Sequence, residues 1–136
     1  MRLLDEVGFP DPAGVARRYP HELSGGMRQR VMIAIALAGA PRLLFADEPT
    51  TALDATVQLQ VLQTLYRLHK ERSMAMAIIT HDLGVVAELC DRVYVMQGGK
   101  VVEAGSTIDV FERPRAPYAA RLVELSTRHA ATRSAA

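Results

Sequence analysis

The chain has 136 residues, of which 49% are apolar and 23% charged, and its formal net charge is +1. This is the composition of a folded globular domain, or of a piece of one, and it excludes a disordered tail. The charge balance gives no argument for a nucleic-acid or anionic membrane surface.

Cysteine content and hydropathy limit the setting of the protein. The lone cysteine, Cys90, excludes a disulfide within the chain and is typical of a reducing, cytosolic compartment. Cys90 lies in an apolar helical stretch, which favours a small buried side chain over a reactive one. The longest apolar run, 31–40, is about half of what a membrane span needs, and the acidic first residues do not resemble a signal peptide. We expect a soluble chain.

The first 41 residues predict two helices. A short helix is expected over 2–7, followed by a loop over 8–14 that contains two prolines and two glycines. A second helix should begin at Ser24, a good N-cap, and run to about Ala38. Gly39 and Pro41 end it.

Two buried parallel strands are predicted next, over 42–47 and 74–80. The helix between them is expected over 55–72, with Asp54 as its N-cap. Four apolar residues of this helix fall on one face at helical spacing: Val57, Val61, Leu65 and Leu68.

The remaining chain predicts a hairpin flanked by short helices. Asp82 should cap a helix that ends near Cys90. Strands over 92–97 and 100–105 flank the turn Gly98-Gly99. Further helices are expected from Ser106 to Pro114 and from Pro117 to about Ser126, followed by a frayed tail over 127–136.

Alternation of strands and helices predicts an α/β fold with a mostly parallel sheet, crossover helices and a C-terminal hairpin as an antiparallel edge. Ligands of such sheets bind beyond the carboxyl ends of the strands. Asp47 and His81 each follow a predicted strand. We therefore expect both at this edge.

The segment "LSGGMRQ" has the features of a phosphate contact. Ser24 offers a hydroxyl, and Gly25 and Gly26 leave backbone N–H groups unscreened at a helix N-terminus, where the dipole favours an anion. The alternative is a plain capped helix with a glycine turn, which Ser-Gly-Gly alone would favour. The motifs that follow favour a functional role.

The segment "RLLFADEP" ends a strand with two acids. Asp47 can hold a magnesium ion through water, and Glu48 can activate a water for attack on a phosphoryl group. The alternative is a solvated acid pair. His81 can hydrogen-bond a terminal phosphate, although a lone histidine after a strand usually has no function.

The four motifs "LSGGMRQR", "LLFADEP", "TALD" and "ITHD", in this order and spacing, resemble the signature motif, Walker B strand, D-loop and switch histidine of an ABC transporter ATP-binding subunit. The segments 19–31 and 109–122 are similar to the peptide and nickel importer group. That group usually has His-Pro-Tyr-Thr where this chain has Ala116-Pro117-Tyr118-Ala119. Met27 replaces the usual glutamine and is a frequent variant in the group.

The resemblance implies a role for each matched residue. Ser24, Gly25, Gly26 and Gln29 would contact the γ-phosphate and ribose side of an ATP bound to the opposite subunit. At the chain's own ATP, Asp47 would organise Mg²⁺, Glu48 would act as general base and His81 would sense the γ-phosphate. Asp54 would communicate across the dimer.

The implied partners are transmembrane permease subunits, a second ATP-binding subunit and, indirectly, a solute-binding protein. Nucleic acid is not among them. The implied location is cytoplasmic, on the inner face of the cell membrane.

The family's phosphate-binding loop, G-x-x-x-x-G-K-[ST], is not found in the 136 residues. Gly99-Lys100 does not fit, because Tyr94 stands where the first glycine belongs and Val101 follows the lysine. The chain therefore resembles the C-terminal half of the ATPase, a partial P-loop NTPase core. We expect the end of a helical subdomain over 1–40, core over 41–113 and a helical extension over 114–136. Its sheet should expose edges and an apolar face.

Two functions remain open at this point. The chain is either a part of an ATP-hydrolysing importer subunit, or a truncated, non-enzymatic fragment or docking module without autonomous ATP binding. An ABC-type DNA-repair or chromosome ATPase ranks well below both. The short spacing between the signature and the Walker B strand and the importer-like flanks argue against it.

Overall fold

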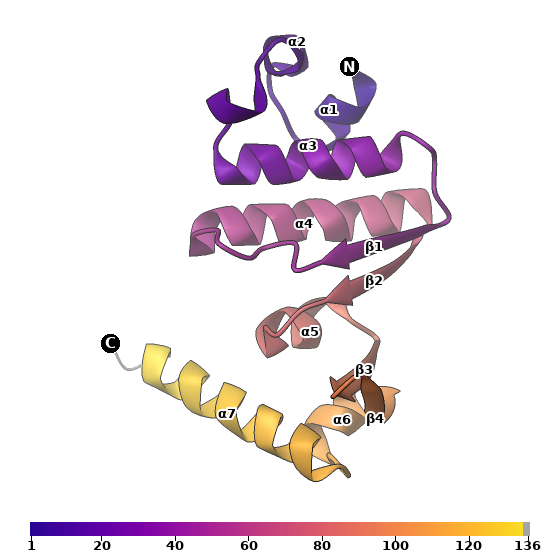
Figure 1. Ribbon diagram of the computed structural model, residues 1–136, viewed down its shortest axis with the longest axis vertical. Helices are drawn as coiled ribbons and strands as arrows, with labels where there is room; N and C mark the ends of the chain where they lie inside the picture. The colour runs from indigo at the N-terminus through magenta and orange to yellow at the C-terminus, as the bar shows by residue number, and fades with distance from the viewer. Residues whose placement is uncertain (135–136) are drawn as a thin grey trace. The chain divides into compact units, whose positions relative to one another are not determined.

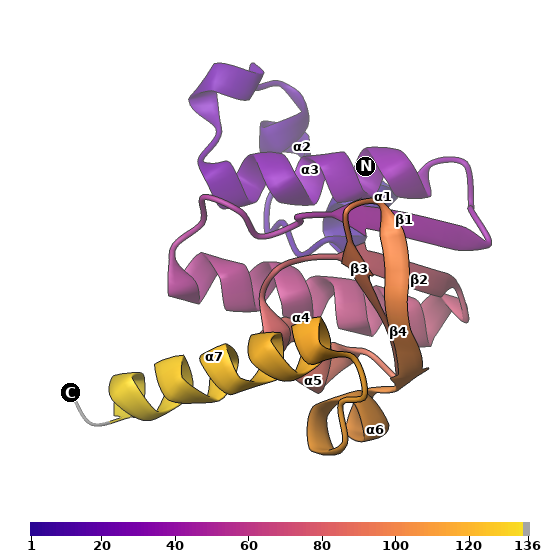
Figure 2. The ribbon, with the colours of Figure 1, turned by 60° about the horizontal axis from the view of Figure 1, so that its bottom comes forward.

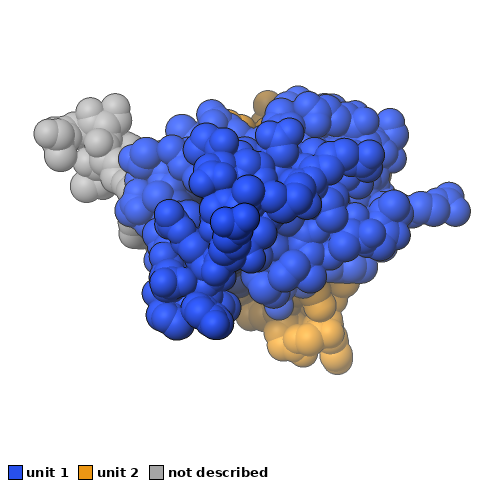
Figure 3. Space-filling view, turned by 90° about the horizontal axis from the view of Figure 1, so that it is seen from above, with its two compact units in different colours: residues 1–79 blue, residues 80–136 orange. Residues whose placement is uncertain are grey.

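The structure is a computed structural model that describes residues 1–134, with side chains described to Ser126. The chain forms two compact units, residues 1–79 and a second unit that begins at Thr80 (Figure 3). Each unit has its own helices and its own pair of strands. The fold is mixed α/β, as predicted.

The first unit begins with a run of helices. In chain order they are α1 (Arg2–Glu6), α2 (Pro12–Ala16), the 3₁₀ helix η1 (Pro20–Glu22) and α3 (Gly25–Leu37). Of these, α2 and α3 have side-chain N-caps. Ser24 caps α3 as predicted, since its Oγ accepts the Met27 N–H at 3.3 Å.

The loop predicted over 8–14 ends earlier than expected. Helix α2 begins at Pro12, because the Asp11 carboxylate accepts the Gly14 N–H at 2.9 Å and proline is well suited to the first helical position. The Pro-Gly composition that indicated a loop therefore marks a capped helix start.

Two parallel strands and one long helix complete the first unit (Figure 1). Strand β1 (Leu43–Asp47) pairs with β2 (Ala75–Ile79) from Leu43↔Ala75 to Asp47↔Ile79. They are joined by α4 (Ala55–Arg72), which has the predicted bounds. Asp54 caps it as predicted, because its Oδ1 accepts the Val57 N–H at 3.0 Å.

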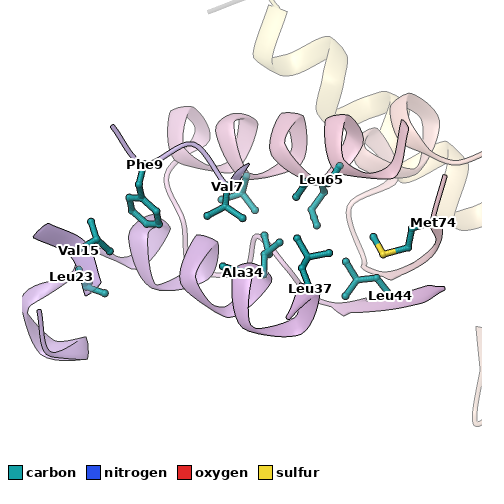
Figure 4. Packing of buried hydrophobic residues seen from close by; sticks show 12 residues of the cluster. Val7, Phe9, Val15, Leu23, Ala34, Leu37, Leu44, Leu65 and Met74 are labelled. Carbon is teal, nitrogen blue, oxygen red and sulfur yellow. The ribbon is translucent and has the colours of Figure 1, made fainter. Parts of the chain in front are cut away.

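The core of the first unit lies between α3, α4, the strands and the N-terminal segment (Figure 4). The predicted apolar face of α4 supplies Val61, Leu65 and Leu68, each no more than 1% exposed. The other members of the cluster are Val7, Phe9, Val15, Leu23, Ile33, Ala34, Leu37, Leu44 and Met74. Helical periodicity thus identified three of the four predicted residues correctly, while Val57 is half-buried and lies outside the cluster.

The strands are less buried than predicted. Side chains alternate across a strand, and Leu44 is buried while its neighbours Leu43 and Phe45 are 48% and 67% exposed. Ile79 on β2 is 53% exposed. The expectation of fully buried strands is therefore wrong. The expectation that the sheet exposes an apolar face is confirmed, because Leu43, Phe45 and Ile79 are exposed on it. The sheet has only two strands among the described residues.

The second unit is built around a hairpin. Its elements are α5 (Leu83–Leu89), β3 (Arg92–Gln97), β4 (Lys100–Ser106), α6 (Thr107–Glu112) and α7 (Pro117–Ser134). Gly98 and Gly99 form the turn with φ of 56° and 76°. Helix α6 packs against both strands (Figure 2).

Two expectations about this unit are corrected. The hairpin does not extend the parallel pair, since β3 bonds only to β4 and the two form a separate antiparallel sheet among the described residues. Helix α7 runs to Ser134 instead of ending near Ser126. No glycine or proline follows Pro117 within it, so nothing in the sequence interrupts the helix.

A carboxylate fixes the start of α7. Glu103 on β4 accepts the Arg115 N–H at 3.0 and 3.1 Å and the Ala116 N–H at 2.8 Å. These backbone hydrogen bonds, with that of Ala116 the larger cause, lower the pKa of Glu103. The carboxylate thus satisfies N–H groups that precede the helix.

None of the helices within residues 1–134 combines the length and apolar character that a membrane crossing requires.

Candidate functional site

The first turn of α3 carries the candidate phosphate contacts. Ser24 is exposed, Gly25 is half-buried and Gly26 is buried. A serine hydroxyl that accepts one hydrogen bond, as Ser24 does from Met27, keeps its own hydrogen to donate. The first N–H groups of an α-helix have no partner within the helix, so this turn offers donors to an anion.

Gln29 lies one helical turn further along α3. Residues three and four apart share a face of a helix, so Gln29 lies on the face of Gly25 and Gly26. It is half-buried. Its amide can both donate and accept, as contact with a ribose or phosphate requires.

The two glycines of α3 pack against the segment that begins α4. A Cβ added to Gly25 would lie 3.1 Å from Leu53 Cδ2, whereas one added to Gly26 would overlap with Val57 Cγ1. The first turn of α3, residues 25–28 (called the signature turn below), is therefore in direct contact with the segment 53–57 that leads into α4. Sequence reasoning placed Val57 on the apolar face of α4 but did not connect Leu53 or Val57 to residues 25 and 26, because no local pattern does so.

The acid pair lies where β1 ends. Asp47 is the last residue of β1, opposite Ile79 of β2, and it is exposed. Glu48 follows with φ of 45°, and its N–H donates to the Ile79 carbonyl at 2.8 Å. The strand register thus places both acids at the carboxyl edge of the parallel pair, as predicted.

A local turn holds the Glu48 side chain. Thr51 Oγ1 donates to Glu48 Oε2 at 2.7 Å, and the Thr51 N–H donates to the Glu48 carbonyl at 3.2 Å. A hydroxyl that donates to a carboxylate stabilises its charged form. Sequence reasoning did not single out Thr51. The available signal was its place three residues after Glu48, between a proline and a helix start.

Asp54 and His81 occupy separate parts of the chain. Asp54 is exposed and belongs to the first unit, where it caps α4. His81 is exposed and belongs to the second unit, two residues beyond Ile79. Next to it, Asp82 caps α5 by accepting the Gly84 N–H at 2.9 Å. The first unit therefore contains the first turn of α3, the acid pair and Asp54, whereas His81 belongs to the second unit.

The donor set of the acid pair fits a magnesium ion that keeps most of its water. Among residues 1–126 there is no group of three or more His, Cys, Asp or Glu side chains that could hold a metal. Mg²⁺ is usually bound by one or two carboxylates together with waters and substrate phosphates. The exposed Asp47 carboxylate matches that need.

Cys90 is half-buried at the end of α5. Desolvation, and secondarily the charge of Asp91, raise the pKa of its thiol. The thiolate is the reactive form, so this environment disfavours reactivity.

Known proteins resemble this chain over most of its length. A family model described as "ABC transporter" matches residues 1–51. The "Glutathione import ATP-binding protein GsiA" of Escherichia coli O1:K1 / APEC is 56% identical over 122 residues. These are 90% of this chain and 20% of that protein. The "Probable D,D-dipeptide transport ATP-binding protein DdpD" of Escherichia coli K12 is 53% identical over 131 residues, 96% of this chain and 40% of that protein.

A solved structure agrees with these matches. It is titled "Dimeric structure of a post-hydrolysis state of the ATP-binding cassette MJ0796 bound to ADP and Pi" and superposes with a TM-score of 0.66 at 32% identity. The match covers 78% of this chain and 44% of that one. The chain thus spans less than half the length of each of these relatives. Within the stretch that they share with it, the chain is similar to the ATP-binding subunits of ABC transporters.

Proposed function

We propose that this chain forms the signature, Walker B and switch portion of an ATP-hydrolysing subunit that energises import of a peptide or a related solute. One observation carries the proposal. The turn 48–54 connects the candidate base to the signature turn within one compact unit, through the Thr51–Glu48 hydrogen bond and the Leu53–Gly25 contact. The match to the dipeptide and glutathione import proteins supports the solute class.

In this proposal, α3 serves a nucleotide held by a second ATP-binding subunit. The Ser24 hydroxyl and the N–H groups of Gly25 and Gly26 donate to the γ-phosphate, and Gln29 reaches the ribose side. The helix dipole adds a favourable field for the negative charge. Asp54, at the start of α4, faces the second subunit.

At the nucleotide of the chain's own subunit, the two acids have different roles. Asp47 holds Mg²⁺ through water, and Glu48 accepts the proton of the attacking water. When bound, Mg²⁺ neutralises charge on the phosphate oxygens. His81 donates a hydrogen bond to the γ-phosphate. Thr51 orients the Glu48 carboxylate through its hydrogen bond.

The proposed assembly contains two ATP-binding subunits, which lie on the inner face of the cell membrane, and transmembrane permease subunits. A solute-binding protein acts indirectly. The dimeric nucleotide-bound neighbour supports the pairing. Residues 1–40 belong to the end of the helical subdomain in this proposal, 41–113 to the ATPase core and 114–136 to the C-terminal extension.

The test must supply a phosphate-binding loop, since no G-x-x-x-x-G-K-[ST] segment occurs in the 136 residues. We would replace the 131-residue matching segment of DdpD by the corresponding residues of this chain and measure ATP hydrolysis with its membrane partners. Glu48→Gln should lower kcat about 100-fold or more while Mg-ATP remains bound, because removing a general base costs about 10²–10⁴ in rate.

Glu88→Gln on α5 is the matched control, since it is an exposed glutamate with the same change of charge. Its turnover should equal that of the unchanged chimera. Normal turnover of Glu48→Gln would remove Glu48 from the base role, and an inactive chimera would count against the function as a whole. The 136-residue chain alone should show no measurable Mg-ATP binding, so micromolar binding would contradict the need for a separate loop.

A further inference from the structure

We infer that Val57 is a positioning residue for the signature turn, and that position 26 is glycine because the Val57 side chain occupies the space of a side chain there. The inference rests on the proposed function for its catalytic consequence. The contact itself stands on the geometry of the first unit.

The approach of the two residues leaves no room at position 26. A Cβ on Gly26 would overlap with Val57 Cγ1 and would lie 3.5 Å from Val57 Cβ and 3.8 Å from Cγ2. Carbon atoms without a bond pack best at about 3.5–4.0 Å. Gly26 is buried, so the added atom has no route toward solvent.

Val57 is poorly able to move away. Its N–H donates to Asp54 Oδ1 at 3.0 Å, and the Gln58 N–H donates to the Asp54 carbonyl at 2.8 Å, which fixes the first turn of α4. A β-branched side chain in a helix has one strongly preferred rotamer. One turn later, Val61 is fully buried in the core.

The backbone of Gly26 gives no other reason for glycine. The glycines with positive φ in the described residues are Gly8, Gly98 and Gly99, so Gly26 has a conformation open to any residue. Alanine has the higher helix propensity, and by that measure it would be preferred inside α3. The requirement at this position is therefore one of space.

Gly25 provides an internal contrast. A Cβ there would lie 3.1 Å from Leu53 Cδ2, the end of a flexible side chain that can give way by a few tenths of an ångström. The two glycines are neighbours in the same helical turn, yet only Gly26 meets a stiff neighbour. If phosphate contact alone required both glycines, alanine should be equally harmful at positions 25 and 26. If packing requires glycine, alanine should be more harmful at position 26.

The contact has a consequence for the site. Helix α4 begins at the Asp54 cap, and the first turn of α3 lies against its first turn. A side chain at position 26 must push these turns apart and shift the N–H groups that we propose to contact the phosphate. Shortening Val57 should make room again.

The test is a double-mutant cycle on the 136-residue chain. Gly26→Ala should lower Tm by about 5 °C or more, since overpacking destabilises small units by that order. In Gly26→Ala with Val57→Ala, most of this loss should disappear relative to Val57→Ala alone. Gly25→Ala should change Tm by less than about 2 °C in either background.

A second measurement follows the position of the signature-turn backbone instead of the stability of the chain. Amide chemical shifts of residues 25–28 in a ¹⁵N-labelled chain should move in Gly26→Ala and return in the double variant. In the DdpD chimera, Gly26→Ala should lower kcat about 10-fold or more, and Val57→Ala should restore at least half of the loss. Val57→Ala should restore nothing in a Gly25→Ala background.

The outcomes separate the two proposals. An unchanged Tm and unchanged amide shifts in Gly26→Ala would overturn the inference, whatever the ATPase rate. Recovery of Tm and shifts without recovery of kcat would overturn the positioning role, because glycine would then be required by the ligand. If the DdpD chimera without point substitutions were inactive, this would count against the proposed function. The amide chemical shifts of residues 25–28 would still decide whether Val57 positions the turn.

Discussion

Each of the two units of this chain is stabilised internally by a different kind of interaction. Residues 1–79 share a continuous apolar cluster of 12 buried side chains. In the described part of the second unit the buried side chains are fewer and smaller: Val85, Val86, Thr107, Val110 and Ala119. Polar contacts there are prominent, including the Glu103 clamp and the Thr107 hydroxyl, which donates to the Cys90 carbonyl. Apolar burial scales with area, whereas each exposed hydrogen bond contributes little.

This difference indicates which substitutions should affect the stability of each unit. The candidate phosphate and acid residues lie in the unit with the larger core, and His81 lies in the other. A core substitution in the first unit should therefore affect stability strongly, while substitutions at polar caps should loosen one segment at a time.

The largest effect should follow Leu65→Ala. Leu65 is 1% exposed at the centre of the cluster, and cutting a buried leucine to alanine costs about 2–5 kcal/mol. Urea unfolding should show the loss, and hydrogen exchange should place it in residues 1–79. Leu59→Ala on the same helix is the control, because Leu59 is 47% exposed. Equal losses in both variants would mean that the cluster does not dominate the stability of this unit.

A smaller effect should follow Glu6→Gln, which weakens the link between α1 and α4. The Glu6 carboxylate accepts a hydrogen bond from Arg72 and pairs with Arg2 at 3.2 Å. Arg72 is the main cause of its lowered pKa. We expect a loss of about 0.5–1 kcal/mol at pH 7, the range for partly exposed ion pairs.

The pH dependence of this pair has a definite sign. A lowered pKa in the folded state gives stability that is fully present above the ordinary value of 4.5 and is lost as pH falls through the lower folded value. Thermal unfolding of the chain and of Glu6→Gln should therefore differ at pH 7, and the difference should shrink as the pH falls below 4.5 and through the lower folded value. Glu71→Gln, which breaks the more exposed pair with Arg67, should have less effect. A difference that persists at low pH would exclude charge as its cause.

The smallest and most local effect should follow Glu103→Gln. The substitution keeps an acceptor near the N–H groups of Arg115 and Ala116 but removes the charge that strengthens both hydrogen bonds. We expect exchange of these two amides to become several-fold faster at pH 7, with little change in residues 1–79. Glu112→Gln on α6 controls for the charge. Faster global unfolding, or faster exchange throughout the chain, would contradict the local character of these hydrogen bonds.

Much of the fold was predictable because its signals are local. Ser24, Asp54, Asp82 and Ser106 each cap the helix that they were expected to cap. The bounds of α4 follow from its cap, its apolar spacing and the absence of a breaker. The order of the motifs led to the family, which the comparisons bear out.

The remaining features depend on pairs that are distant in the sequence. Nothing near Gly26 indicates that Val57 fills its side-chain space, and nothing in β3 shows that it pairs with β4 alone. The exposure of Phe45 follows from the number of strands in the sheet, which the composition of one strand does not reveal. The roles of the site residues stay predictions, because they depend on a nucleotide and a second subunit.

The backbone of Glu48 has a consequence for how this position can change. Its φ of 45° lies in the left-handed region, where a residue with a side chain is strained at a cost of about 1 kcal/mol or more. Glycine would adopt the same conformation freely, so Glu48→Gly should relieve the strain while it removes the carboxylate. The same change would remove the hydrogen bond from Thr51. A glutamate at this position therefore carries a backbone cost that glycine would not carry.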